Sequence, residues 1–124
     1  MSESLNEVYQ QLRPLLQKYS TKLVAKKDSE KGIELWTNKE ITWSGRQFRE
    51  LFFASAAIQK NFVGFYYFPI YMHPETKKDI SPRLLKLLKG KSCFHVKKLD
   101  DELLKDIESS LKKGYEFYKK QGFV

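Results

Sequence analysis

The residues best suited to chemistry in this chain are Cys93 and His95, two positions apart in a segment whose apolar and polar residues alternate. Residues two apart on a strand face the same side, so the thiol and the imidazole can reach each other or a shared ligand. Lys91 and Lys97 have the same parity, and their charge would lower the pKa of the thiol. Three uses stay open: a packed core thiol, a ligand contact, or a catalytic or metal-binding pair. We favour the packed thiol, because a lone cysteine on a half-buried strand usually acts as a small apolar residue.

Other catalytic and metal-binding patterns are missing from the sequence. The chain has one cysteine and two histidines, and neither histidine has the other at metal-ligand spacing. It contains no glycine-rich phosphate loop, no serine nucleophile elbow and no carboxylate pair at catalytic spacing. The acidic run at residues 100–102 is typical of a helix N-terminus. We therefore expect no metal and no cofactor, and a binding protein more than an enzyme; an enzyme using Cys93 and His95 is an alternative.

A second group of candidates surrounds the aromatic run at residues 60–72, which is typical of a β-strand. Tyr67, Tyr71 and His73 could project from the end of this strand, with Lys60 at its start. Aromatic rings with polar tips suit a small-molecule pocket, and core packing with hydroxyls at the rim explains the same residues. The candidate ligand-binding residues are therefore Lys60, Tyr67, Tyr71, His73, Lys91, Cys93 and His95.

The net charge of +8 is concentrated in one part of the chain. Between residues 76 and 98, eight basic residues accompany a single acid, Asp79. Such a segment suits a small anionic ligand or an acidic protein partner, and a solvated lysine face is the alternative. Trp36 and Trp43 lie near arginines, but no RNA-binding motif accompanies them, so we do not expect nucleic acid as a partner.

The 124 residues predict a single domain over residues 1–124. No apolar run reaches the ~18 residues of a membrane span, and the polar N-terminus lacks the apolar segment of a signal peptide. One cysteine excludes an internal disulfide. We expect a cytoplasmic protein without membrane contact, as a monomer or a weak homodimer.

Hydrophobic periodicity predicts a helix over residues 2–19, capped by Ser2 or Ser4 and kinked or restarted at Pro14. A last helix begins after Asp100, and a short helix of about nine residues runs from Ser81 to Gly90. Strands are predicted at residues 22–25, 32–37, 40–43, 47–58, 60–72 and 92–97. The result is an α+β domain with a mainly antiparallel sheet of about five strands and helices packed on one face.

Within the strand predicted at residues 47–58, simple alternation assigns the faces. Phe52 shares a face with Ala54 and Ala56, and Phe53 shares the other with Ser55. The strand at residues 60–72 is expected to be central, because apolar groups stand on both of its faces.

Four motifs resemble a branch of the YdhG-like family of small bacterial proteins. They are Lys60-x-Phe62-Val63-x-Phe65, Pro69-Ile70-Tyr71-Met72, Ile80-Ser81-Pro82-x-Leu84 and Gly90-Lys91-Ser92-Cys93-Phe94-x-x-Lys97. The resemblance covers roughly residues 32–117 and implies a frataxin-like α/β sandwich. An iron-carrying role has been proposed within that family, so an iron-binding chaperone is a further alternative. Frataxins carry a dense acidic ridge on the first helix and strand, whereas the first helix here offers only Glu3 and Glu7.

Overall fold

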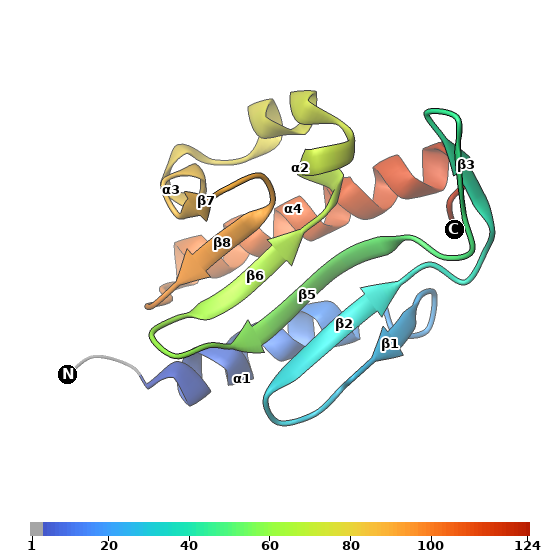
Figure 1. Ribbon diagram of the computed structural model, residues 1–124. Coiled ribbons are helices and arrows are strands. Elements are labelled where there is room, and N and C mark those ends of the chain that lie inside the picture. The colour runs from blue at the N-terminus through green and yellow to red at the C-terminus, as the bar shows by residue number, and fades with distance from the viewer. Residues whose placement is uncertain (1–3) are drawn as a thin grey trace.

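The aromatic run forms β6 (Val63–Tyr67), an inner strand of the main sheet in the computed structural model, which describes residues 4–124 (Figure 1). It pairs antiparallel with β5 (Phe52–Ile58) on one side and with β8 (Cys93–Val96) on the other. The sheet continues outward to β2 (Gly32–Trp36) and β1 (Val24–Lys26) past β5, and to β7 (Leu88–Lys89) past β8. The predicted α+β class, the antiparallel sheet and the central place of this strand are confirmed.

The sheet differs from the prediction in the number of its strands. It has six strands instead of about five, and a separate two-stranded ribbon pairs β3 (Ile41–Trp43) with β4 (Arg46–Phe48). The extra strand is β7, which pairs with β8 through two register positions. Local sequence did not reveal β7, because Leu88 continues the leucine spacing of the helix predicted between Ser81 and Gly90.

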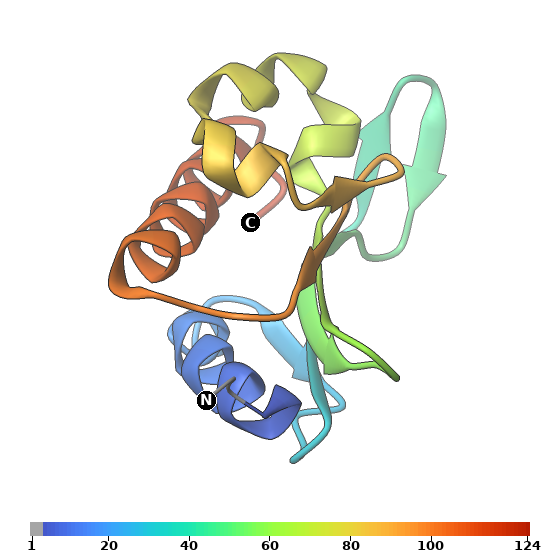
Figure 2. The same cartoon turned by 90° about the vertical axis from the view of Figure 1, so that its left-hand side faces the viewer.

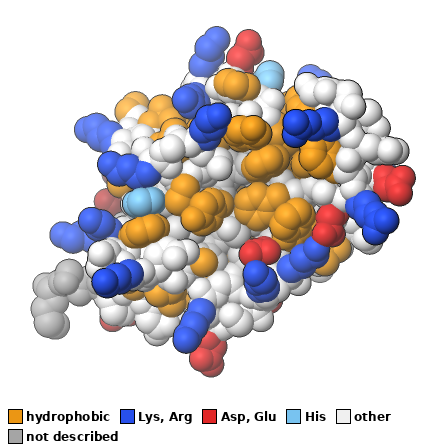
Figure 3. All heavy atoms as spheres, in the orientation of Figure 1, with side chains coloured by type: hydrophobic (Ala, Val, Ile, Leu, Met, Phe, Trp, Pro, Cys, Tyr) orange, Lys and Arg blue, Asp and Glu red, His pale blue; other side chains and the backbone are white. Residues whose placement is uncertain are grey.

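Two long helices, α1 (Leu5–Gln17) and α4 (Asp101–Lys120), cover one face of the sheet, as the edge-on view shows (Figure 2). Their caps follow the sequence: the Ser4 hydroxyl accepts from the amide of Glu7 at 3.1 Å, and the Asp100 carboxylate accepts from the amide of Leu103 at 2.7 Å. The buried residues of the two helices are Val8, Tyr9, Leu12, Leu16, Leu103, Ile107, Ser110, Leu111, Gly114 and Tyr118. No helix of the described residues covers the opposite face of the sheet, and hydrophobic side chains gather over its middle (Figure 3).

Several predicted element boundaries are wrong. The first helix runs through Pro14 as one element and ends two residues earlier than expected; Ser2, the alternative cap, lies outside the described residues. The central strand ends at Tyr67, and residues 69–72 form α2 (Pro69–Met72), because proline suits the first turn of a helix. The helix after Ser81 is α3 (Pro82–Leu85), with four residues instead of about nine. A 3₁₀ helix, η1 (Pro74–Asp79), fills the loop between α2 and α3.

The strand predicted at residues 47–58 is broken after Phe48 and contains a β-bulge. Leu35 pairs with Ala54 but its neighbour Trp36 pairs with Phe52, so Phe53 is the extra residue. Both Phe53 and Ala54 are consequently fully buried on the helix side, whereas Phe52 turns to the open face beside Trp36, with ring centroids 5.2 Å apart. The predicted sharing of a face by Phe52 and Ala54 is therefore wrong, and so is that by Phe53 and Ser55.

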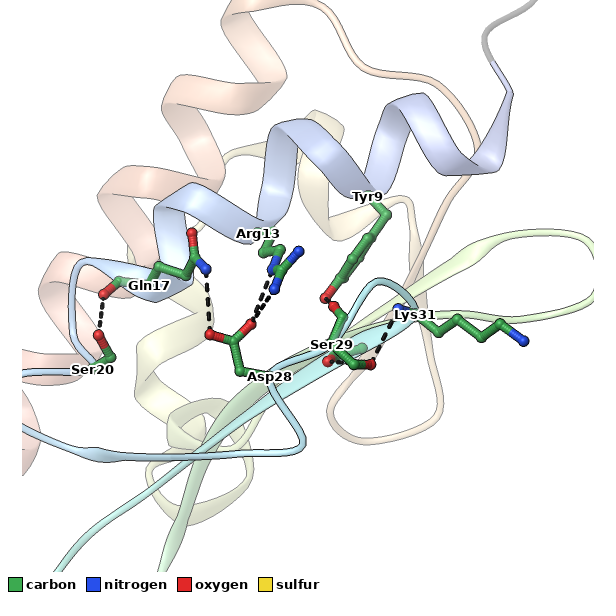
Figure 4. A network of polar contacts seen from close by, with 8 residues as sticks. Tyr9, Arg13, Gln17, Ser20, Asp28, Ser29 and Lys31 are labelled. Carbon is green, nitrogen blue, oxygen red and sulfur yellow. Dashed lines mark hydrogen bonds and ion pairs between the residues drawn. The ribbon is translucent and has the colours of Figure 1, made fainter.

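A polar network fastens the β1–β2 connection to α1 (Figure 4). The Tyr9 hydroxyl donates to the carbonyl of Ser29 at 2.7 Å, and the Arg13 guanidinium pairs with the Asp28 carboxylate at 2.8 Å. The same carboxylate accepts from the side-chain amide of Gln17 at 3.3 Å. These contacts help to hold the edge strand β1 in place. This strand has three residues and pairs with β2 alone, so it forms few backbone hydrogen bonds.

Candidate functional site

A surface hollow of about 490 Å³ lies where β7 and β8 meet the short helix α3, the residues that follow it, and the start of α4. Five cationic side chains and one carboxylate line it, together with His95 and two leucines. We call this site the basic hollow; its lining residues are Arg83, Lys86, Leu87, Lys89, His95, Lys97, Lys98, Asp100 and Leu103. Five of the eight basic residues of segment 76–98, which was predicted to attract anions, thus line one concave site.

Arg83 connects α3 to α4 through ion pairs. Its guanidinium pairs with Glu102, and its Nε donates to the Asp106 carboxylate at 2.7 Å. Both bonds raise the pKa of Arg83, and the bond to Glu102 has the larger effect. The Ser81 hydroxyl, which caps α3, also lies 2.7 Å from the Asp106 carboxylate. Because two carboxylates offset its charge, Arg83 adds little uncompensated charge to the basic hollow.

The uncompensated charge comes from the four lysines. Within residues 4–124 no ion pair joins an acid to Lys86, Lys89, Lys97 or Lys98. The one lining carboxylate, Asp100, is already bonded to the backbone of α4 as its cap. Like charges around a concave surface with apolar walls concentrate a positive potential there, and that potential attracts anions.

The apolar part of the basic hollow comes from Leu87, Leu103 and the His95 ring. His95 is held in place on β8: its backbone amide donates to the carbonyl of Leu87 at 2.9 Å. Its imidazole stacks on the ring of Phe62, with centroids 3.7 Å apart and planes 9° apart. A ligand with an apolar portion beside its charge would therefore find surface for both.

Cys93 lies on the same face of β8 as His95 but does not line the basic hollow. The predicted alternation is confirmed, since Phe94 and Val96 are buried in the core and Cys93 and His95 face the other way, half-buried. Cys93 lies directly opposite Tyr66 on β6, near enough for the Tyr66 hydroxyl to stabilise the thiolate. Burial raises the pKa of the Cys93 thiol, and the Tyr66 hydroxyl offsets part of this increase. The expectation that Lys91 and Lys97 lower this pKa is therefore wrong.

We expect Cys93 to react slowly with a thiol reagent at neutral pH. Only the thiolate reacts, and a raised pKa keeps the folded thiol protonated to higher pH than an ordinary cysteine. The labelling rate is measured as a function of pH in the folded protein and in urea-unfolded protein. The rate for the folded protein should begin to rise at a higher pH than the rate for the unfolded protein. Tyr66→Phe should shift this rise to still higher pH, because it removes the hydroxyl that lowers the pKa of Cys93. Rapid labelling of the folded protein at about pH 6.5 would contradict this.

The remaining candidates are spread over the molecule. Tyr67 is fully buried, its hydroxyl bonds to the carbonyl of Ser110, and burial raises its pKa. Tyr71 is exposed, and the Lys91 ammonium lies 5.7 Å from its ring centroid, so the fold brings these two together. His73 stacks on the ring of Phe117 at 5.0 Å, and Lys60 lies exposed in the β5–β6 turn.

Among the seven candidates, all within the described residues, His95 alone lines the basic hollow. The predicted set missed the lysines of that hollow and Arg83, although each belongs to the basic segment noted in the sequence. The signal that could have found them was the density of positive charge, not any one residue.

In the described part of the chain, no three His, Cys, Asp or Glu side chains are placed to hold a metal ion together. None of the helices within residues 4–124 combines the length and apolarity that crossing a membrane would require. Fold and site together define an α+β domain with a basic surface hollow. Comparison of the chain with protein-family models, with characterised proteins and with solved structures found no match.

Proposed function

We propose that the protein binds a small anionic molecule in the basic hollow and acts as a binding protein. The observation that carries this proposal is a group of four lysines around one cavity of about 490 Å³, none of them paired with an acid of residues 4–124. A volume of this size suits a small organic ligand. The two lining leucines and the stacked His95 imidazole favour an anion that also has an apolar part.

The type of cation narrows the chemistry of the ligand. Lysine ammonium groups are compact point charges, whereas the planar guanidinium of Arg83, suited to two-pronged binding, is occupied by Glu102 and Asp106. Recognition would therefore depend on the amount of negative charge more than on the planar shape of a carboxylate. A phosphate monoester with an aryl or alkyl group fits this description best.

We further propose a cytoplasmic setting and a relationship to the YdhG-like proteins. The motifs around residues 60–72 and 80–97 support the relationship, and a single half-buried cysteine is in keeping with a reducing compartment. For this chain we propose anion binding in preference to iron transport, because the charge of the basic hollow would repel a metal cation.

Phenyl phosphate is a suitable probe, and nuclear magnetic resonance titration at low salt can report both affinity and place. Replacing Lys89 and Lys97 together by glutamine should weaken binding about tenfold, because each ammonium contributes to the local potential. The matched control is Lys112→Gln with Lys120→Gln on exposed positions of α4, which removes the same charge elsewhere and should change affinity less than about threefold.

Salt provides a second check on the same probe. Affinity should fall as the ionic strength rises from about 50 to about 200 mM, because exposed charges are screened. An equal loss of affinity in both double variants, or an affinity that does not respond to salt, would overturn the proposal. Tighter binding of a single-stranded oligonucleotide than of phenyl phosphate would also overturn it, in favour of a nucleic-acid partner.

A further inference from the structure

A second hollow of about 490 Å³ lies on the open face of the main sheet, and its walls are largely aromatic. The rings of Trp36, Phe48, Phe52 and Phe68 line it, and the carboxylates of Glu34 and Glu50 lie at its margin. We call it the aromatic hollow. Figure 3 shows this face, with hydrophobic side chains gathered at its centre and acidic side chains beside them.

The bulge in β5 and the strand register together build the aromatic hollow. The bulge turns Phe52 outward, between the rings of Trp36 at 5.2 Å and Phe68 at 5.8 Å. Beside these rings, Glu34, Ser55 and Tyr66 lie directly opposite one another on β2, β5 and β6. The aromatic wall therefore has a row of polar side chains along one border.

The chain's own cation already occupies the margin of this hollow. The Lys26 ammonium lies 4.7 Å from the centroid of the Trp36 ring and pairs with the Glu50 carboxylate. Glu34 accepts a hydrogen bond from the Trp36 indole nitrogen at 3.1 Å, which orients the ring. An ammonium over an aromatic face with a carboxylate beside it is the arrangement by which proteins recognise organic cations.

Lys26 is not firmly built into the core. It lies on β1, an edge strand of three residues, and its side chain is 39% exposed. Its partner Glu50 is 37% exposed and precedes β5 in a segment without regular structure. A competing cation could therefore take over both the ring and the carboxylate without disturbing the fold.

We propose that the aromatic hollow binds an organic cation, namely a primary ammonium attached to a flat apolar body. The body would pack against Trp36 and Phe52, and the ammonium would replace that of Lys26 beside Glu50. Charge supports this occupant through Glu50: Glu34 is already paired with Lys27 at 3.6 Å, whereas the Glu50 carboxylate is left without a cation once the Lys26 ammonium moves away. This site is distinct from the basic hollow and has the opposite charge preference.

The test compares three ligands that share an indole ring and differ in the charge of the side chain. They are the cation tryptamine, its neutral alcohol analogue tryptophol, and the anion indole-3-propionate. Binding followed by nuclear magnetic resonance should show tryptamine about tenfold tighter than tryptophol, with shifts at Trp36 and Phe52. Indole-3-propionate should not shift these residues. Glu50→Gln should weaken tryptamine about tenfold, and the control Glu116→Gln, at an exposed position of α4, should change it less than about twofold.

Lys26→Gln gives the most specific result. Removal of the competing ammonium should tighten tryptamine binding by about threefold or more, which a merely apolar surface would not do. Equal affinity for tryptophol and tryptamine, weaker binding by Lys26→Gln, or self-association that buries Trp36 in place of the ligand would each overturn the inference. The glutamine variants of Lys89 and Lys97 should leave tryptamine affinity within about twofold, so this test is independent of the proposed anion site.

Discussion

Phe53→Ala should lower the free energy of unfolding by about 3–5 kcal/mol, the largest effect we expect from a single substitution. The Phe53 ring is fully buried on the helix side of the sheet, against Tyr115 and Tyr118 of α4. Its centroid lies 6.0 Å from that of Tyr19 and 5.1 Å from that of Tyr118. Truncation to alanine removes the burial of the ring and leaves a cavity that these rigid aromatic neighbours cannot fill. Urea unfolding followed by circular dichroism measures the loss.

Phe52→Ala is the matched control, because it removes the same ring from the adjacent residue. Phe52 is half-buried on the open face, where truncation leaves solvent in place of a closed cavity. We expect a loss of about 1–2 kcal/mol. Equal losses for the two variants would mean that Phe53 is not the residue that the bulge turns inward.

Gly114→Ala should destabilise the protein by about 3 kcal/mol, although alanine favours a helix by ~1 kcal/mol over glycine. A β-carbon at position 114 would lie 2.9 Å from Cγ of Pro69 and 2.9 Å from Cε1 of Tyr67, and closer still to the Tyr67 hydroxyl. Tyr67 cannot move aside, because it is fully buried and its hydroxyl is bonded to the carbonyl of Ser110. Thermal and urea unfolding should both show the loss.

A double-mutant cycle can assign this loss to the contact with Tyr67. Tyr67→Phe removes the atom nearest to the new β-carbon, so the double variant should lose less than the sum of the two single variants by about 1 kcal/mol. The control Ser109→Ala, at an exposed position of the same helix, should stay within about 0.5 kcal/mol of the parent. Strict additivity would show that Gly114→Ala acts through Pro69 or through the helix itself.

Features set by local chemistry could be predicted from the sequence. The Ser4 and Asp100 caps and the alternation of Phe94 and Val96 were predicted because each depends on neighbouring residues only. The end of the central strand could not be predicted, because Pro69 is equally compatible with a strand end and with the first turn of a helix. The bulge at Phe53 depends on pairing with β2, which is about twenty residues away in the chain.

The sites required knowledge of tertiary contacts. The density of basic residues predicted that some surface would be positive, but the pairing of β7 with β8 and the bond from Arg83 to Asp106 select the lysines that surround a cavity. The aromatic hollow was not predicted at all. Regular alternation places Phe52 in the core, and only the bulge brings it beside Trp36.

The two outer strands of the sheet limit how copies of this protein can join. An exposed sheet edge is a template for another strand, and long flat edges lead to fibrils. Here β1 has three residues and β7 has two, and each contains a lysine, Lys26 or Lys89. An incoming strand would find few backbone groups to pair with and a lysine side chain at either edge. The strongly β-forming aromatic sequence is kept in the middle of the sheet, where it cannot seed amyloid while the protein stays folded.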